Sequence, residues 1–472
     1  MSCSIRRSQP SRSSRRRGAA AIRPQAWGAL CAGVAVGLLS PVQTLSAAPT
    51  VVPVQTFTSP QAVDQDDMCL WVHPQDPALS LVIGSDKAAG YVLVYDLEGN
   101  LRQSIHTGQP GNIDVRYGIP LAGQCVDLVA FNERDERLIR VYRVDPSTRT
   151  LVRVDDGAIT TGSNYGFTLH RPMEGSLYAT TGSGILRQYL LFENATGGIS
   201  GTATGWSLER GTVEGMVGDD ETGFVYLSEE AVGIWKVSAF DDSLATLIAQ
   251  AGDSSGLWSD VEGITIHYAP LGGGSIIASS QGASRFTVFD RLPPHAPVGN
   301  FQLDDVTSTD GIDVLNMSLN GVFTAGIFLA HDGGNPSTMV AAKWEDIVAV
   351  VPGMQNDPQY WDPRACQTSS TTPPRGAAPV ARAVLHPNSP NPVNPSTRIR
   401  FTLQEDSAVR LAVHDLQGRR LALLADGVHA AGTHSIEWRA ADAQGTKLPS
   451  GVYVCRLEAS GVQASIKLVV AK

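Results

Sequence analysis

The sequence predicts an all-β protein, and three observations support this prediction. Glycine (47 residues) and proline (28 residues), which mark turns and interrupt helices, are plentiful. Short runs of alternating apolar and polar residues outnumber helical patterns. A polar or acidic group, often with a glycine and then an alternating run, recurs six times at near-equal intervals. Together these features predict a six-bladed β-propeller followed by a small β-sandwich.

The first 48 residues have the composition of a secretory signal peptide. They contain seven arginines and no acidic residue, with an apolar run from Trp27 to Leu39 and small residues at Ala47 and Ala48. The apolar run is too short to span a membrane, and no later segment supplies a span. We therefore expect a secreted or cell-surface protein whose mature chain starts after Ala48 and has no membrane span.

The charge is concentrated in the middle of the chain. The formal net charge is −10; with seven arginines in the leader and a balance of +4 from residue 381 onward, residues 49–380 carry about −21. Such a surface disfavours nucleic acid as a partner, and it requires divalent cations next to any anionic ligand. Four cysteines follow the leader, and their three possible pairings remain open: Cys69, Cys125, Cys366 and Cys455.

The repeat explains how acids that are distant in sequence come together. Its markers, at intervals of 48, 51, 49, 46 and 50 residues, are Asp66, Asp114, Tyr165, Glu214, Asp260 and Asp310. The innermost strand of each propeller blade runs along the central channel, so equivalent positions meet at one rim. The acids expected there are Asp66, Asp67, Asp114, Glu214, Glu229, Glu230, Asp260, Glu262, Asp310, Asp313 and Asp332.

The composition of this rim predicts bound calcium. Each acid taken alone is also compatible with a solvated turn residue or a strand-end cap, but the set would repel itself without cations. Oxygen ligands without CxxC or HExxH spacing favour calcium over zinc. Groups that can hold phosphate oxygens lie among the acids: Lys87, Arg116, Arg134 and Tyr165. Because no GxSxG, P-loop or GxGxxG motif is present, hydrolysis here would rely on metal-bound water.

These motifs resemble those of the β-propeller phytases, calcium-dependent enzymes that release phosphate from myo-inositol hexakisphosphate. The resemblance extends from about Asp64 to Ile347. It rests on the segments Asp66-Asp67-x-x-Leu70-Trp71-Val72-His73-Pro74, Asn112-Ile113-Asp114-Val115-Arg116-Tyr117, Tyr165-Gly166-Phe167, Glu214-Gly215, Glu229-Glu230, Asp260-x-Glu262-Gly263, Ser279-Ser280-Gln281-Gly282, Thr309-Asp310-Gly311-Ile312-Asp313 and Asp332-Gly333.

The resemblance implies a 3-phytase that binds several calcium ions and acts by attack of calcium-bound water on a calcium–phytate complex. The implied metal ligands are Asp66, Asp67, Asp114, Glu214, Glu229, Asp260, Glu262, Gln281 and Asp310. Catalysis is assigned to Asp260, Glu214, Lys87, Arg134 and Tyr165, and substrate binding to Lys87, Arg116, Arg134, Tyr165 and Arg187. We expect a monomer.

Some positions depart from the family pattern. A lysine of the family appears as Ser183, with Arg187 as a nearby substitute; an acid before Thr309 appears as Ser308; and Met68-Cys69 and Gly111 are also unusual. These changes leave two alternatives open. One is a non-catalytic propeller that binds calcium and anionic ligands at the cell surface, and the other is a propeller hydrolase for a different phosphoester.

The sequence of residues 349–472 predicts a linker and a second domain. Residues 349–384 are rich in Ser, Thr and Pro, and alternating runs follow at Thr397–Leu403, Val409–Asp415, His434–Trp438 and Gly451–Leu457. This pattern resembles the C-terminal Ig-like sorting domains of proteins exported by type IX secretion, and a spacer sandwich without a sorting role is the alternative. The predicted layout is a signal peptide (1–48), a propeller (49–348), a linker (349–384) and an Ig-like domain (385–472).

Overall fold

The structure is a computed structural model of the 472-residue chain. It describes residues 48–354 except 172–175, 241 and 270–272, and residues 383–470 except 386–387, 389–392, 394, 404–405, 415–418, 431 and 460–461. The chain divides into two compact units, Met1–Cys366 and Gln367–Lys472. The predicted signal peptide up to Ala47, most of the predicted linker, and Cys366 lie outside the described residues.

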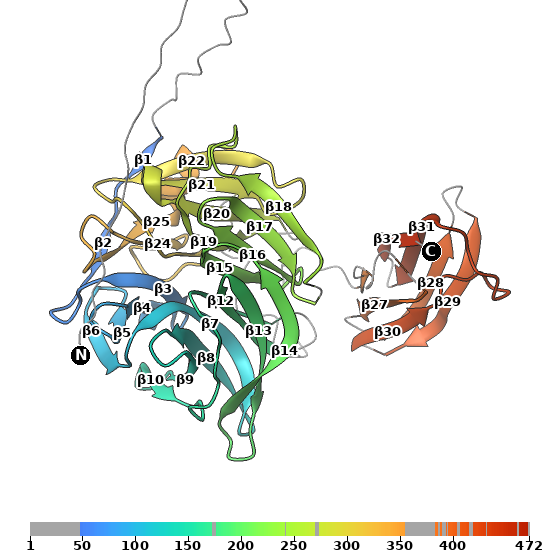
Figure 1. Ribbon diagram of the computed structural model, residues 1–472, viewed down its shortest axis with the longest axis horizontal. Coiled ribbons are helices and arrows are strands. Elements are labelled where there is room, and N and C mark those ends of the chain that lie inside the picture. The colour runs from blue at the N-terminus through green and yellow to red at the C-terminus, as the bar shows by residue number, and fades with distance from the viewer. Residues whose placement is uncertain are drawn as a thin grey trace, which may run out of the picture. The chain divides into compact units, whose positions relative to one another are not determined.

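The first unit is a ring of six antiparallel sheets, the blades, shown in Figure 1. Blade 1 is formed by β3 (Gln65–Trp71), β4 (Leu81–Asp86), β5 (Tyr91–Asp96) and β6 (Leu101–His106). Blade 2 is formed by β7 (Pro110–Leu121), β8 (Gln124–Glu133), β9 (Leu138–Asp145) and β10 (Thr150–Arg153). Blade 3 is formed by β11 (Gly166–His170), β12 (Leu177–Ser183), β13 (Ile185–Glu193) and β14 (Ile199–Glu209). The strands of each blade pair in chain order.

Blades 4 and 5 follow the same order. They are formed by β15 (Val213–Asp219), β16 (Phe224–Glu229), β17 (Gly233–Ser238) and β18 (Ala245–Gln250); and by β19 (Val261–Tyr268), β20 (Gly274–Ser280), β21 (Arg285–Asp290) and β22 (Pro297–Leu303). Short 3-10 turns lie at Pro77–Leu79 and Gln281–Ala283. Helix α1 (Trp344–Val350) follows the last propeller strand.

Blade 6 joins the two ends of the propeller sequence. Its inner strands are β23 (Ile312–Leu315), β24 (Ile327–His331) and β25 (Met339–Lys343), and its outer strand is β2 (Gln55–Phe57) from the N-terminal side. The short strand β1 (Thr50–Val51) pairs in parallel with β22 of blade 5. Early residues therefore complete the last two blades.

The innermost strands form a closed circle around the channel. Each contacts the innermost strand of the next blade, in the order β3, β7, β11, β15, β19 and β23, and β23 returns to β3. Each predicted repeat marker lies in one of these strands or at most two residues before it. The prediction of a six-bladed propeller with a C-terminal β-sandwich is therefore confirmed.

A buried charge cluster ties three blades together at the end of β15. The guanidinium of Arg291 is 1% exposed and donates to both oxygens of Asp219 at 2.6 and 2.9 Å and to Glu221 at 2.7 Å. Arg116 of blade 2 forms an ion pair with Asp220 at 2.9 Å. Blade 4 is thus held by arginines from blades 2 and 5.

The second unit is a small sandwich of two sheets. One sheet contains β26 (Ala383–Leu385), β27 (Thr397–Leu403) and β30 (Gly432–Trp438), and the other contains β29 (Arg420–His429), β28 (Ser407–His414), β31 (Gly451–Ala459) and β32 (Val462–Val470). Its core includes Phe401, Leu411 and Leu457, which are fully buried. The described cysteines, Cys69, Cys125 and Cys455, are free thiols. Among the described residues, no helix is long and apolar enough to cross a membrane.

Candidate active site

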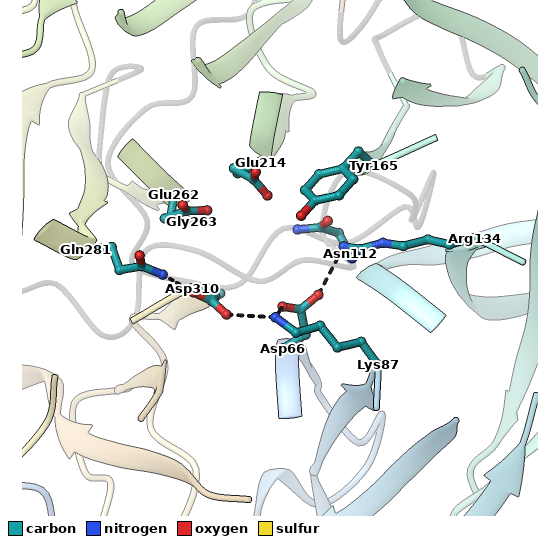
Figure 2. A pocket seen from close by; sticks show the side chains of 11 residues that line it. Asp66, Lys87, Asn112, Arg134, Tyr165, Glu214, Glu262, Gly263, Gln281 and Asp310 are labelled. Carbon is teal, nitrogen blue, oxygen red and sulfur yellow. Dashed lines mark hydrogen bonds and ion pairs between the residues drawn. The ribbon is translucent and has the colours of Figure 1, made fainter. Parts of the chain in front are cut away.

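All six blades contribute to one polar pocket at the start of the innermost strands. The pocket is lined by Asp66, Lys87, Asn112, Arg134, Tyr165, Glu214, Glu262, Gly263, Gln281, Asp310 and Gly311. Figure 2 shows the side chains of Glu214, Glu262, Asp310 and Gln281 around a common space, with the ring of Tyr165 beside Glu214. The sequence prediction that acids from separate blades meet at one rim therefore agrees with this geometry for four carboxylates.

Irregular strand pairing directs these side chains into the pocket. The register of the first two strands shifts in four blades, between Gln65 and Asp67, Pro110 and Ile113, Val213 and Met216, and Val261 and Ile264. Each shift contains one pocket residue with a polar side chain: Asp66, Asn112, Glu214 or Glu262. A β-bulge inserts a residue and changes the direction of a side chain, which is why bulges often occur beside functional sites.

Glycines after the acids let neighbouring blades approach closely. The N–H of Gly263 donates to the carbonyl of Asp310 at 2.9 Å, and the N–H of Gly311 donates to the carbonyl of Asp66 at 2.9 Å. A Cβ on Gly263 would lie 2.3 Å from the Asp310 oxygen, and one on Gly311 would lie 2.1 Å from Asp67 Oδ1. The recurring acid–glycine pair therefore places an acid in the pocket and joins the blade to the next one.

Two cations of the chain are paired with acids in the pocket. Lys87 Nζ lies 2.7 Å from Asp66 Oδ1, 3.2 Å from Asp310 Oδ2 and 3.7 Å from Asp64 Oδ2. Arg134 Nη2 lies 3.1 Å from Asp66 Oδ2, and its guanidinium stacks 4.2 Å from the ring centre of Tyr165. Although burial raises the pKa of Asp66, Arg134 and Lys87 outweigh that effect and lower it. Asp66 is therefore an ionised carboxylate between two cations.

The opposite side of the pocket presents two carboxyl groups without a partner in the described part of the chain. The side chains of Glu214 and Glu262 have no hydrogen-bond or ion-pair partner among the residues that the structure describes. Burial, with repulsion from Asp66, Glu230 and Asp310, raises the pKa of Glu214 to about 7 despite the attraction of Arg134. Burial, then repulsion from Glu214 and Asp310, raises the pKa of Glu262 to about 9. These two oxygen-donor groups are available for a cation.

A second layer of acids lies in the channel near the pocket. Asp67, Asp114 and Asp313 line a smaller cavity together with the thiol of Cys69. Asp67 accepts from the N–H of Ile113 at 3.0 Å, and Asp313 accepts from the N–H of Leu70 at 2.9 Å. The sequence could not separate these acids from those of the pocket, because neighbouring residues of a strand face opposite directions.

Other predicted site residues lie outside the pocket lining. Asp114 is bound by Arg116 at 2.8 Å, deeper in the channel. Glu229 accepts from the N–H of Gly211 at 2.6 Å and from the indole N–H of Trp235 at 2.7 Å.

Asp260 and Arg187 also lie outside this lining. Asp260 precedes β19 with a positive φ of 58°, and its carbonyl accepts from the N–H of Gln281 at 2.8 Å. Arg187 lies in β13 beside the Gly162 loop, so close that a Cβ on Gly162 would be 2.5 Å from its Nη1. Asn112, which sequence reasoning did not select, does line the pocket; its place before Asp114 in a repeat motif is the signal that could have identified it.

The donor set of the pocket fits a hard divalent cation. No group of three His, Cys, Asp or Glu side chains in the described part of the chain converges closely enough to define a single metal position. The pocket nevertheless presents four carboxylates and the amides of Asn112 and Gln281, all of which offer the oxygen ligands that calcium prefers. The Lys87 ammonium, within 3.2 Å of both Asp66 and Asp310, shows that a positive charge is accommodated between them.

Comparisons with known proteins agree with the fold and the site. The model of the family described as "Phytase" matches residues 29–355, and that of the "FlgD Ig-like domain" matches residues 393–462. The 3-phytase of Bacillus subtilis (strain 168) is 36% identical over 305 residues, covering 60% of this chain and 79% of the relative.

Two solved structures share a weak likeness with this chain. The surface component PorZ of the type-IX secretion system of Porphyromonas gingivalis has a TM-score of 0.33 at 13% identity, covering 87% of this chain and about half (53%) of its own. The Dos1 propeller has a TM-score of 0.34 at 9% identity, covering 62% of this chain and 95% of its own. These scores carry no argument about function. The phytase model, by contrast, matches more than half of this chain, and the pocket lies within the matched residues, so the chain belongs to the phytase family.

Proposed function

We propose that this protein is a secreted, calcium-dependent phytase that hydrolyses phosphate monoesters of myo-inositol hexakisphosphate. The observation that carries the proposal is the pocket in which Glu214 and Glu262 face the cations Lys87 and Arg134. Family membership and the 36% identity to a 3-phytase support the same activity. The proposed substrate is phytate, presented as its calcium complex.

The cationic side of the pocket would hold the phosphate group that is transferred. Lys87 and Arg134 present N–H donors, and Tyr165 presents a hydroxyl group, on the side where Asp66 is already compensated. Such donors are most effective where phosphate charge is held away from bulk water. Arg116 and Arg187 remain proposed substrate contacts, although neither lines the pocket, and Arg116 is paired with Asp114 and Asp220.

The acidic side would hold calcium. Asp66, Glu214, Glu262, Gln281 and Asp310 are the proposed ligands within the pocket, and Asp67, Asp114, Glu229 and Asp260 are those proposed around it. Bound calcium supplies charge neutralisation and acidifies water for attack on phosphorus. The carboxylates would orient the cations, and Glu214 and Glu262 are half-buried, which limits competing solvent.

The remaining features of the proposal concern location and organisation. The arginine-rich leader supports export, and the tail supports a sorting or spacer role for the Ig-like domain at the cell surface. The layout of signal peptide (1–48), propeller (49–348), linker (349–384) and Ig-like domain (385–472) remains a prediction. We expect the mature protein to act as a monomer.

A phosphate-release assay with calcium phytate tests the activity. We expect release that EDTA abolishes and that Asp260→Asn strongly reduces. The variant removes a charge while keeping a side chain that tolerates the positive φ of 58° at this position. A matched control is Asp145→Asn, at the end of β9, where the carboxylate bonds only nearby hairpin groups.

The outcome also separates the alternatives. Phytate binding without phosphate release at any pH from about 5 to 9, a range that spans common catalytic pKa values, would reject the enzyme and favour a calcium-dependent binding module. Faster release from another phosphomonoester in a substrate panel would replace phytate as the substrate. Release that is unchanged by EDTA would contradict the role of calcium.

A further inference from the structure

Blades 4 and 5 bring a lysine and a histidine together away from the pocket. Lys236 lies in β17, opposite Tyr226 of β16, and His295 lies in the loop between β21 and β22. Strand β21 begins shortly after the pocket residue Gln281 and runs along the blade to Asp290. The loop that follows β21 therefore lies at the opposite end of the blade from the pocket.

The amine of Lys236 donates to the imidazole ring of His295. Lys236 Nζ lies 3.3 Å from His295 Nε2, and Nδ1 of the same ring lies 3.1 Å from the carbonyl oxygen of Asp290. Because a carbonyl oxygen can only accept a hydrogen bond, this network assigns the ring proton to Nδ1 and leaves a lone pair on Nε2. The carbonyl of Asp290 therefore selects the tautomer in which His295 can act as a base towards Lys236.

The surroundings of Lys236 favour the neutral amine. The side chain is half-buried, with Nζ 4.2 Å from the ring centre of Phe224 and 5.8 Å from that of Tyr226. Among the described residues, Lys236 forms no ion pair. Burial lowers the pKa of Lys236 despite the attraction of Asp219, and the charge of Arg291 lowers it further. A larger share of this amine is therefore unprotonated than in an exposed lysine.

The pair has the arrangement of an activated nucleophile. Burial, followed by the charge of Lys236, lowers the pKa of His295, so the ring is neutral at about pH 7. A base lies within hydrogen-bond reach of the amine and is oriented by a third group, here the carbonyl of Asp290. Lys87 differs, because three carboxylates within 3.7 Å of its Nζ raise its pKa despite burial. Of these two lysines, Lys236 is therefore the better nucleophile.

We infer that Lys236 is a covalent modification site that forms an imine with small aldehydes, with His295 as the general base. As the neutral Nζ attacks the carbonyl carbon, His295 Nε2 accepts a proton from nitrogen and the carbonyl oxygen gains one, which gives a carbinolamine. Loss of water then forms the C=N bond, so an amine and an aldehyde become an imine and water. The half-buried position of Lys236 favours small aldehydes over larger sugars. This inference does not depend on the proposed function.

Reductive methylation of the full chain tests this reactivity. Formaldehyde forms the imine, dimethylamine–borane reduces it to a stable amine, and peptide mass spectrometry gives the rate at each lysine. The exposed Lys447 is the matched control. An amine with a lower pKa gains less from a rise in pH, so from about pH 7 to about pH 9.5 the rate at Lys236 should rise at least about threefold less than that at Lys447. Each lysine is compared with itself, which removes the difference in their exposure.

A second variant tests the base. Asparagine tolerates the positive φ of 59° at His295 but cannot act as a base, so His295→Asn should slow methylation of Lys236 at least about 10-fold at about pH 7. His106→Asn, on the exposed side of β6, is the matched control and should leave this rate unchanged.

Three results would overturn the inference. They are no methylation of Lys236 at either pH, an equal pH response of Lys236 and Lys447, or an unchanged rate at Lys236 in a His295→Asn protein that keeps the melting temperature of wild type. If His295→Asn does not fold, the comparison of the two lysines in wild type decides the inference by itself.

Discussion

Substituting Glu262 by glutamine should stabilise the calcium-free protein and weaken its response to calcium. Burial and neighbouring acids raise the pKa of Glu262 from 4.5 to about 9. In the unfolded chain this carboxyl ionises above pH 4.5, whereas in the folded protein it keeps its proton until about pH 9. The folded state therefore loses stability as the pH rises between these values. At pH 7 the loss amounts to about 3 kcal/mol, since each pKa unit corresponds to about 1.4 kcal/mol.

Glutamine has the same shape and no charge, so the variant should avoid this loss. Denaturant unfolding of the full chain in EDTA at pH 7, followed by tryptophan fluorescence, should show Glu262→Gln to be more stable than wild type by about 3 kcal/mol. The difference should shrink towards pH 4.5. An exposed control, Glu98→Gln, should stay within about 0.5 kcal/mol of wild type.

Calcium should reverse the advantage. Wild type gains stability from an ion that binds only the folded state, and the variant, with one donor fewer, should gain at least about 1.4 kcal/mol less, which corresponds to tenfold weaker binding. A variant that is less stable than wild type in EDTA would show that Glu262 has a stabilising partner and refute the charge argument. An equal response of both proteins to calcium would remove Glu262 from the ligand set.

Two further predictions concern the scaffold. Replacing Arg291 by methionine leaves Asp219 buried without its ion-pair partner, and should lower the free energy of unfolding by about 3–5 kcal/mol. Denaturant titration measures this loss, and a value below about 1 kcal/mol would contradict the proposed contribution of the ion pairs between blades 4 and 5. His267 is buried against Trp344, and neither of its ring nitrogens has a hydrogen-bond partner among the described residues. Burial, followed by the charge of Arg291, lowers its pKa from 6.5 to about 3. Because the unfolded chain takes up this proton first, wild type should lose about 2 kcal/mol between pH 7.5 and pH 5 through this group, and His267→Phe should lack that part of the pH dependence; identical pH profiles of unfolding would contradict it.

The sequence predicted the propeller because a repeat of about 50 residues leaves a periodic signal that does not depend on atomic detail. It also predicted which segments meet at the mouth of the channel, since the marker residues lie within the innermost strands or just before them. It could not predict which residue of each segment enters the pocket. Asp66 lines the pocket while Asp67 faces the channel, and Glu262 lines the pocket while Asp260 does not.

The reason is physical. A side chain changes face with every residue of a strand, and a β-bulge adds one residue to that count, so a local irregularity of pairing decides the direction. The register shift between Val261 and Ile264 is set by contacts with β20, which are not encoded in the motif itself.

The strand Gln55–Phe57 gives the propeller a particular order of assembly. It forms the outer edge of the blade whose other strands end at Lys343, and Phe57 is fully buried there. During synthesis, five blades can be made before this pairing is possible, because nearly 290 residues separate the paired strands in the sequence. The ring of blades therefore stays open until β25 has been made. A protease that cleaved the chain after Phe57 would remove β2 and leave the edge of β25 open to pairing with another chain.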